Sequence, residues 1–187
     1  MKSFRWMALL LAAAALNGCG KPAAASGGPA PAPAMSATKL PPGYVNLPGL
    51  PTKAQPKLAT VKVWLGAEER IAEMAVSPAE VNTGMMFRTN MVENEAMLFV
   101  LPFEQQASFW MPNCPLPLSV AYISPDGVVQ EIHPLEPFNT NSVYSAVTNI
   151  RFALETRQGW FDRHHIGTGT VVRTERGSLK QTFLERQ

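Results

Sequence analysis

The clearest periodic signal in the chain is an alternation of polar and apolar residues over positions 60–65 and again over 71–76. A period of two is typical of a strand that has one face buried and one face in water. The intervening run at 66–70 begins with glycine and is otherwise mostly charged, as a tight turn often is. The two stretches are therefore predicted to pair as a β-hairpin.

The residues that follow the second stretch carry the signals of a helix start. Ser77 can cap a helix, Pro78 suits its first position, and Glu80 stands three residues after the cap, where it can close a capping box. The pattern predicts a short helix that ends near Thr83 or Arg88.

The remaining folded sequence consists of short apolar or alternating runs separated by turn signals. Residues 96–101 are continuously apolar and are closed by Pro102, which favours a buried strand over a helix. Pro, Asp and Gly at 125–127 are a turn signal, because proline presets φ and glycine accepts a positive φ. Further strands are predicted at 106–111, 118–123, 128–133, 147–155 and 168–174, with a turn or short helix at 158–165.

About eight short strands separated by turns predict a mainly β domain, with a minor α+β component of one or two short helices. We expect one mostly antiparallel sheet that is curled or closed like a small barrel. The pattern contains no helices long enough to cover a parallel sheet. This single domain is predicted to occupy residues 58–187.

The first 19 residues resemble a bacterial lipoprotein signal peptide. Lys2 and Arg5 precede an apolar stretch at 6–16, and Cys19 follows small residues, so Cys19 is the expected lipidation site. The alternative is an uncleaved anchor helix, but the apolar stretch is shorter than the ~20 residues that a bilayer span needs. Gly20, rather than Asp, favours the outer membrane where a cell has two membranes. We expect an exported protein, held to the membrane by lipid, with its domain facing the periplasm or the exterior.

Residues 20–57 are predicted to be a disordered tether. Nine of the chain's 17 prolines lie there, mixed with Ala, Gly and Ser. Such a composition buries too little apolar surface to offset the entropy of ordering it. The apolar side chains of this tether that could dock on the domain are Tyr44, Val45, Leu47 and Leu50.

Loss of the signal peptide also changes the charge and the thiol count. Lys2 and Arg5 leave, so the formal net charge falls from +2 to zero. A neutral domain has no electrostatic basis for binding nucleic acid. Once Cys19 carries lipid, Cys114 is the remaining thiol, which excludes an intramolecular disulfide.

Several short sequence blocks stand in order between positions 60 and 174. They are Glu80, GMMFR at 84–88, MLF at 97–99, FWM at 109–111, Asn113, PL at 117–118, DG at 126–127, LE at 154–155 and GW at 159–160. Together they resemble the family called domain of unknown function 192. The resemblance implies a small β-rich domain, often exported or membrane-tethered, with no established activity. The chain departs from the usual pattern at Met85 (commonly Leu), Pro112 (Lys), Cys114 (Thr) and Ser119 (Asp).

The charged residues most embedded in apolar sequence are Arg88 and Glu155. A buried charge without a partner costs several kcal/mol, so both are expected to be paired. One interpretation is an internal ion pair between them that fixes the helix on the sheet. The other is that Arg88 lies at the floor of a pocket and binds a ligand carboxylate or hydroxyls through two hydrogen bonds.

A shallow pocket near the central turn is the second candidate feature. Trp110, Met111, Asn113 and Tyr144 would line it, together with Phe109. Aromatic faces beside an amide suit sugar rings or other flat amphipathic ligands. The alternative is that Phe109 and Met111 are core, that Trp110 faces outward, and that Asn113 bonds the backbone of its own turn.

Catalysis would depend on Cys114, with His133, His164 or His165 as its base. A nucleophilic thiol needs such a base within reach and a lowered pKa. No adjacent cation and no Cys/His motif support that role, so a structural thiol is favoured. The methionines are interpreted as core filling rather than a soft-metal site, and no metal or cofactor is predicted.

Three functions remain open. The first is a non-catalytic binding domain for a small molecule, a glycan or an envelope protein partner, with its site at Arg88, Glu155 and the central turn. The second is a structural or assembly lipoprotein in which the same residues are core. The third is an enzyme that uses Cys114 or a carboxylate. The first is favoured, and no catalytic residue is assigned.

Overall fold

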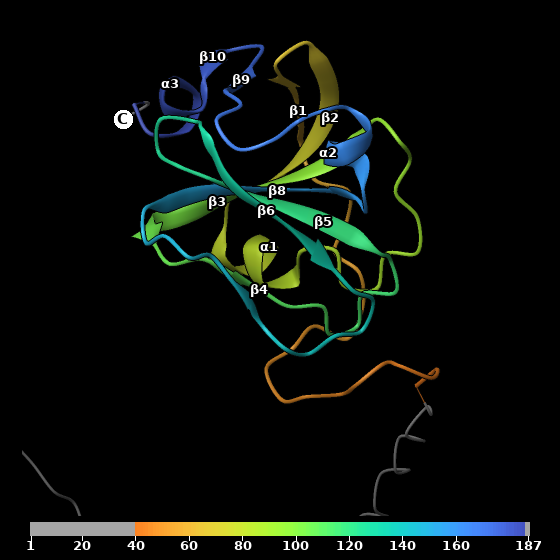
Figure 1. Ribbon diagram of the computed structural model, residues 1–187. Coiled ribbons are helices and arrows are strands. Elements are labelled where there is room, and N and C mark those ends of the chain that lie inside the picture. The colour runs from red at the N-terminus through yellow and green to blue at the C-terminus, as the bar shows by residue number, and fades with distance from the viewer. Residues whose placement is uncertain (1–39, 186–187) are drawn as a thin grey trace, which may run out of the picture. The chain divides into compact units, whose positions relative to one another are not determined.

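The computed structural model describes residues 40–185, so the predicted signal peptide, Cys19 and the first half of the predicted tether lie outside the described residues. The described residues form ten strands and three short helices (Figure 1). They are β1 (Thr60–Leu65), β2 (Glu68–Ala75), α1 (Pro78–Thr83), β3 (Glu95–Gln105), β4 (Ser108–Phe109), β5 (Leu118–Ile123), β6 (Val129–Leu135), β7 (Val143–Tyr144), β8 (Ile150–Arg157), α2 (Trp160–Arg163), β9 (Val172–Thr174), β10 (Gly177–Ser178) and α3 (Leu179–Phe183). None of these helices is long and apolar enough to cross a membrane.

Eight strands form one mixed sheet in the order β10-β9-β1-β2-β3-β8-β5-β6, while β4 and β7 pair separately. The prediction of a mainly β domain with a minor helical part is confirmed. β2 and β3 run parallel, because α1 lies between them and carries the chain back across the sheet, whereas a hairpin would reverse it. The predicted closure into a barrel is wrong. The end strands β10 and β6 do not pair, and where the two edges approach each other, Val128 and Val171 form an isolated bridge rather than a ladder.

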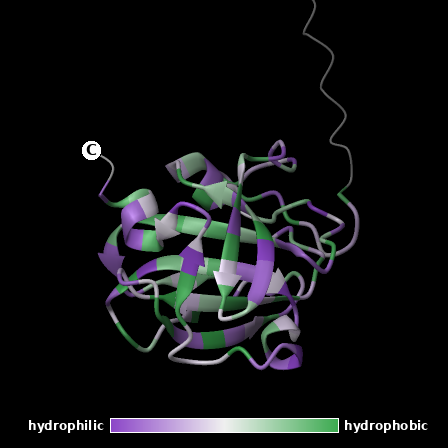
Figure 2. Cartoon of the chain, turned by 90° about the horizontal axis from the view of Figure 1, so that it is seen from above, coloured by the Kyte–Doolittle hydropathy of each residue, from purple (hydrophilic) through white to green (hydrophobic). Residues whose placement is uncertain are grey.

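The central strands β3, β8 and β5 are covered on both faces. In β8, Phe152 and Leu154 belong to one apolar cluster, which includes Trp160 of α2 and is called the α2-side cluster. Ala153 belongs to the other, which Val81 of α1 packs against and which is called the α1-side cluster. Figure 1 shows α2 and α3 on one side of these strands and α1 and β4 on the other, and Figure 2 shows hydrophobic and hydrophilic positions alternating along the strands.

Helix α1 begins as its sequence predicts. Ser77 Oγ accepts a hydrogen bond from the backbone N–H of Glu80 (3.3 Å), and Glu80 Oε2 accepts one from the N–H of Ser77 (2.8 Å). The backbone N–H groups of Ser77 and Val76 lower the pKa of Glu80. The helix ends at Thr83, the shorter of the two predicted lengths, because Gly84 then takes a positive φ of 45°.

The segment at 40–57, which falls within the predicted tether, contacts the domain. The Tyr44 ring stacks on Phe87 with ring centroids 5.4 Å apart. The N–H of Val45 donates a hydrogen bond of 2.7 Å to Asn113 Oδ1. The contacts of the domain therefore begin before the predicted boundary at residue 58.

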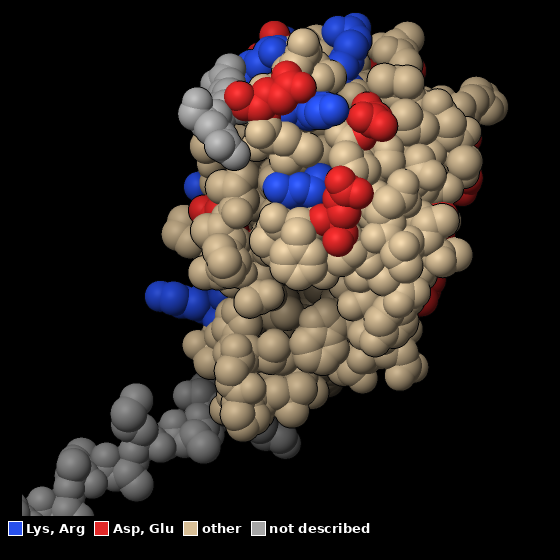
Figure 3. Space-filling view, turned by 90° about the vertical axis from the view of Figure 1, so that its left-hand side faces the viewer, with Lys and Arg blue, Asp and Glu red and all other residues tan. Residues whose placement is uncertain are grey.

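Charges of both signs are interspersed on the face drawn in Figure 3. Lys, Arg, Asp and Glu side chains gather in its upper part, and its lower part is largely uncharged. Exposed ion pairs such as Lys62–Glu69 (3.0 Å) bring opposite charges together on the domain surface. This face consequently carries no extended patch of one sign.

Candidate functional site

A cavity of about 490 Å³ lies beside α1. Its walls come from residues 76–86, which include α1, and from residues 99–111, which include the second half of β3. Residues 49–51 of the N-terminal segment form one edge, and Cys114 and Glu155 complete the lining. The volume falls within the range of about 300–1,000 Å³ that is common for small-molecule sites.

The cavity walls are largely apolar and aromatic. Phe99 and Phe109 meet edge to face, with ring centroids 4.9 Å apart. Met85 and Met111 are buried, whereas Trp110 is 38% exposed and so also faces solvent. These side chains offer flat and polarizable surfaces to an apolar ligand.

Glu155 supplies the only carboxyl group of the cavity lining within the described residues. It lies on β8, between Met97 of β3 and Val120 of β5. Ala153 faces the α1-side cluster, and strand alternation turns Glu155 to the same side. Its side chain is almost completely buried, at 3% exposed, and Oε2 has no hydrogen-bond partner within residues 40–185. Burial raises the pKa of Glu155 to about 8, so the carboxyl is mostly protonated at neutral pH.

Arg88 pairs with Glu73 of β2, and the predicted Arg88–Glu155 pair is wrong. Nη1 lies 2.8 Å from Glu73 Oε1 and Nη2 lies 2.8 Å from Oε2, a two-pronged pair. Glu73, Met97 and Glu155 stand in one row across β2, β3 and β8. Neighbouring strands are about 4.8 Å apart. Glu155 is two strands away from Glu73, so it lies roughly 10 Å from the carboxyl group that Arg88 binds. Arg88 is also not among the cavity-lining residues.

The other predicted site residues divide into two groups. Trp110 and Met111 line the cavity, as expected of a pocket near the central turn. Asn113 is fully buried outside the lining, and its side chain bonds Val45 rather than its own turn. Tyr144 is 59% exposed on β7 and is also outside the lining. The structure therefore brings together Trp110, Met111 and Glu155, and separates them from Arg88 and Tyr144.

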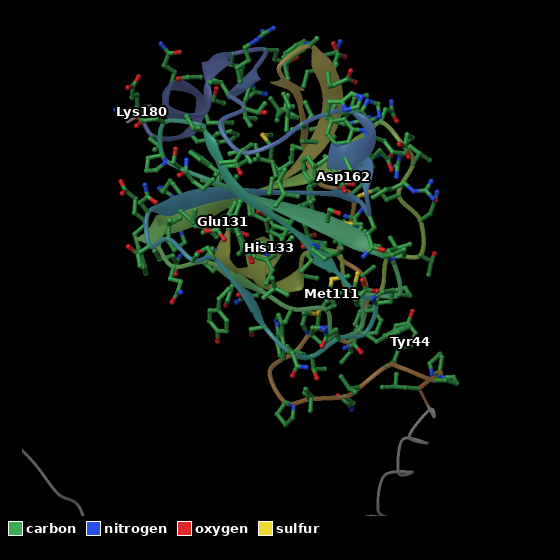
Figure 4. All side chains as sticks on the ribbon, viewed as in Figure 1. Tyr44, Met111, Glu131, His133, Asp162 and Lys180 are labelled. Atoms are coloured by element: carbon green, nitrogen blue, oxygen red, sulfur yellow. The ribbon has the colours of Figure 1, made fainter. Side chains whose placement is uncertain are left out.

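Cys114 lines the cavity but is not placed as a nucleophile. Burial and, to a smaller extent, the charge of Glu155 raise the pKa of its thiol to about 12. Its sulfur contacts the carbonyl oxygen of Leu116 at 3.9 Å. Within residues 40–185 no histidine bonds Cys114: His133 lies 2.9 Å from Glu131 Oε2 on the same strand (Figure 4), and His164 stacks on Trp160. A thiol held neutral in this way is a poor nucleophile.

The remaining polar groups of the lining are amides and hydroxyls, such as those of Gln105, Gln106, Thr83 and Ser108. No Lys, Arg or His side chain is part of the described lining. Residues 40–185 also contain no group of three or more His, Cys, Asp or Glu side chains that could hold a metal ion. The arrangement can bind and orient a ligand, and it offers one protonatable group.

Sequence reasoning missed the contribution of the N-terminal segment and of α1 to the cavity. Leu50 and Pro51 lie in the stretch assigned to the tether, and Val81 lies on α1. Leu50 was recognisable as an apolar side chain able to dock, but the sequence does not show where it docks. Val81 is an ordinary apolar helix position, and no local signal distinguishes a cavity wall from a core.

Comparison with known proteins shows what this chain is similar to. A solved structure from Sinorhizobium meliloti 1021, described as a candidate transcription regulator, is 26% identical, with a TM-score of 0.61 over 65% of this chain and 98% of that one. A protein of unknown function from Novosphingobium aromaticivorans DSM 12444 is 25% identical, with a TM-score of 0.57 over 72% of this chain and 98% of that one. No curated protein matches the chain. The model of the family described as "Uncharacterized ACR" matches residues 62–174, more than half of the chain, so the chain belongs to this domain of unknown function 192 (DUF192) family.

Proposed function

We propose that this protein is a lipid-anchored protein of the cell envelope whose domain binds a small molecule in the cavity without converting it. The observation that carries the binding part is the cavity of about 490 Å³, with apolar walls and one buried carboxyl oxygen that has no partner within residues 40–185. Sites for small molecules typically combine a preformed apolar pocket with a few placed polar groups. The anchoring part is supported by the lipoprotein-like first 19 residues.

The character of the walls favours a small and largely apolar ligand over a glycan or an envelope protein. A sugar presents hydroxyls on every side, and each buried hydroxyl needs a hydrogen-bond partner. The side chains of Phe99, Phe109 and Met85 offer none, so the amides and hydroxyls of the lining could serve only part of a sugar's surface. A protein partner would need a large exposed surface, whereas this site is a recess in the domain.

Two other functions compete with this proposal. A structural or assembly lipoprotein would use the same domain with the cavity unoccupied, and the Arg88–Glu73 pair suits such a role because it joins β2 to the chain after α1. An enzyme that uses Cys114 would need a lowered thiol pKa, and that pKa is raised. An enzyme that uses Glu155 would find no His, Lys, Arg or second carboxyl beside it in the described lining. The S. meliloti neighbour is described as a transcription regulator, and binding to DNA needs a patch of positive charge. The face of this protein drawn in Figure 3 shows charges of both signs interspersed and no such patch.

The anchor is tested by changing Cys19. We expect the wild-type protein in the outer-membrane fraction, with an N-terminal peptide whose mass includes acyl chains, since several chains together give stable anchoring. The Cys19→Ser variant should lose this modified peptide and leave that fraction. Cys114→Ser is the matched control and should stay with the membrane. A mature wild-type protein that is freely soluble, with Cys19 unmodified, would contradict the anchor.

The cavity is tested by filling it. Hexylamine, hexanol and hexanoate share one apolar chain and differ in the charge of the head group. We expect at least one of them to bind the full-length protein in isothermal titration calorimetry. Val81→Trp should abolish this binding, because Val81 lines the cavity and a larger ring would occupy its volume.

The matched control for this substitution is Val92→Trp. Val92 is 44% exposed and lies outside the cavity lining, so its variant should bind as the wild type does. If none of the three probes binds, or if Val81→Trp binds them unchanged, the small-molecule proposal is wrong.

A further inference from the structure

We infer that the cavity takes an organic ammonium ion, a primary amine on a small apolar body, with Glu155 as its counter-ion. This inference rests on the proposed binding function and names the chemical class of the ligand. It follows from three features of the cavity: the carboxyl group without a partner, the absence of cations in the described lining, and the aromatic and thioether walls.

Oε2 of Glu155 has no hydrogen-bond partner within the described residues, and once the carboxyl is ionised it needs donors. Its Oε2 is buried with no partner within residues 40–185, although nearly all buried polar atoms in folded proteins are paired. An ionised carboxylate only accepts hydrogen bonds, and an ammonium group has three donors and no acceptor. A ligand amine therefore supplies what the site lacks, and it brings no acceptor that would itself need a donor.

An anionic ligand would find no cation in the described lining. Glu155 is the only residue of the described lining that carries an ionisable carboxyl, and no Lys, Arg or His accompanies it. Arg88, which could have bound an anion, is occupied by Glu73 through both of its terminal nitrogens. A carboxylate or phosphate ligand would therefore meet a carboxyl group without a compensating cation.

The walls suit a cation on an apolar body. Phe99, Phe109 and Trp110 present aromatic rings to the cavity, and ring faces attract ammonium groups electrostatically. Met85 and Met111 add polarizable thioether surface, which adapts to irregular aliphatic groups. Each of these contacts is compatible with a neutral ligand as well, so the counter-ion at Glu155 is what distinguishes the amine.

Binding of an ammonium ion should also expel a proton. The titratable groups that face Glu155 from the packed elements are the Cys114 thiol and the Tyr122 phenol on β5, and the pKa of each is raised, mainly by burial. Both stay neutral near neutral pH, so the proton must come from Glu155 itself. The ammonium pairs with the ionised carboxyl, and the proton that Glu155 held passes to the buffer.

The test compares the three probes of equal chain length in the full-length protein. We expect hexylamine to bind several-fold more tightly than hexanol at neutral pH, because the hydrogen bonds to the ionised carboxyl outweigh the cost of releasing the proton that Glu155 holds. Hexanoate should bind more weakly than hexanol. The heat of hexylamine binding should differ between two buffers of unequal ionisation enthalpy, in proportion to the protons released, and the heat of hexanol binding should not.

Two variants separate the contribution of Glu155 from the rest of the cavity. Glu155→Gln should remove the preference for the amine and leave the affinity for hexanol within about twofold, because the shape of the side chain is kept. Glu104→Gln is the control, since Glu104 is exposed and outside the lining, and it should retain the preference.

Each result then has one meaning. If hexanol binds as tightly as hexylamine, or if the preference survives in Glu155→Gln, the ammonium inference is overturned. The binding proposal would still stand in that case, provided that Val81→Trp blocks hexanol. If no probe binds at all, the binding proposal itself fails and the inference falls with it.

Discussion

Replacing Arg88 with methionine should lower the free energy of unfolding by about 3 kcal/mol, the lower end of what breaking a buried ion pair costs. Arg88 and Glu73 form two hydrogen bonds of 2.8 Å, and their side chains are only 16% and 11% exposed. Arg88 also donates to the carbonyl oxygen of Pro56, at 3.2 Å. Without the guanidinium, the Glu73 carboxylate stays in a largely buried position with no cation beside it. Urea denaturation of the full-length protein at neutral pH measures the loss.

Two further variants show whether the loss of stability comes from the Glu73 carboxylate that Arg88→Met leaves without a cation. Adding Glu73→Met to Arg88→Met should recover part of the stability, because no unpaired charge remains, although the N–H of Leu58 loses the Glu73 oxygen to which it donates at 2.7 Å. Lys62→Met breaks the exposed Lys62–Glu69 pair, whose side chains are 49% and 44% exposed, and should change the free energy by less than about 1 kcal/mol. An Arg88→Met protein as stable as the wild type would show that the pair contributes nothing.

Local signals in the sequence predicted local structure well. The alternation at 60–65 corresponds to β1, and the helix start at Ser77 forms the capping box that its spacing indicates. The apolar run at 118–123 is β5, buried at every position. These features depend on neighbours within a few residues along the chain, which is the range over which hydrophobic period and capping chemistry act.

Pairing between distant segments could not be predicted in the same way. A buried arginine needs a carboxylate, but that requirement does not decide between Glu73 and Glu155. The choice depends on strand order, which places Glu73 on β2 and Glu155 two strands farther in, with Met97 between them. The strand order depends in turn on the parallel pairing of β2 with β3. No turn signal in the sequence predicts this pairing, because the connection between the two strands passes through α1.

The candidate site depends on the same long-range arrangement. Trp110 and Met111 were recognisable because they stand beside the central turn, and both line the cavity. Asn113 appeared similar, but its positive φ of 58° and its bond to Val45 make it a support for the N-terminal segment. A side-chain amide near aromatic residues does not reveal whether it faces a ligand or a backbone. The sequence indicates that Glu155 is buried and offers Arg88 as its partner. In the structure Arg88 pairs with Glu73, so Glu155 lines the cavity without Arg88 beside it.

Because Glu155 has no cation, the stability of the wild-type protein should fall as the pH rises from 4.5 to about 8. Burial raises the pKa of Glu155 from its ordinary value of 4.5 to about 8. Between these values the unfolded chain has released a proton that the folded chain still holds, so rising pH favours unfolding. The slope approaches about 1.4 kcal/mol per pH unit, and the whole window amounts to a few kcal/mol. The contribution of Glu155 to stability is complete below pH 4.5 and is lost as the pH passes through about 8.

The Glu155→Gln variant should not show this decline, because the amide does not ionise. At acidic pH the variant should be about as stable as the wild type or slightly less stable, since its amide is equally without partners. Above pH 8 it should be the more stable protein by a few kcal/mol, so the two stability curves should cross. Urea denaturation of both proteins across this pH range measures the difference, which isolates Glu155 from every other titrating group. Glu104→Gln removes an exposed carboxyl and should follow the wild-type curve; a Glu155→Gln curve that runs parallel to the wild type would show that Glu155 ionises freely in the folded protein.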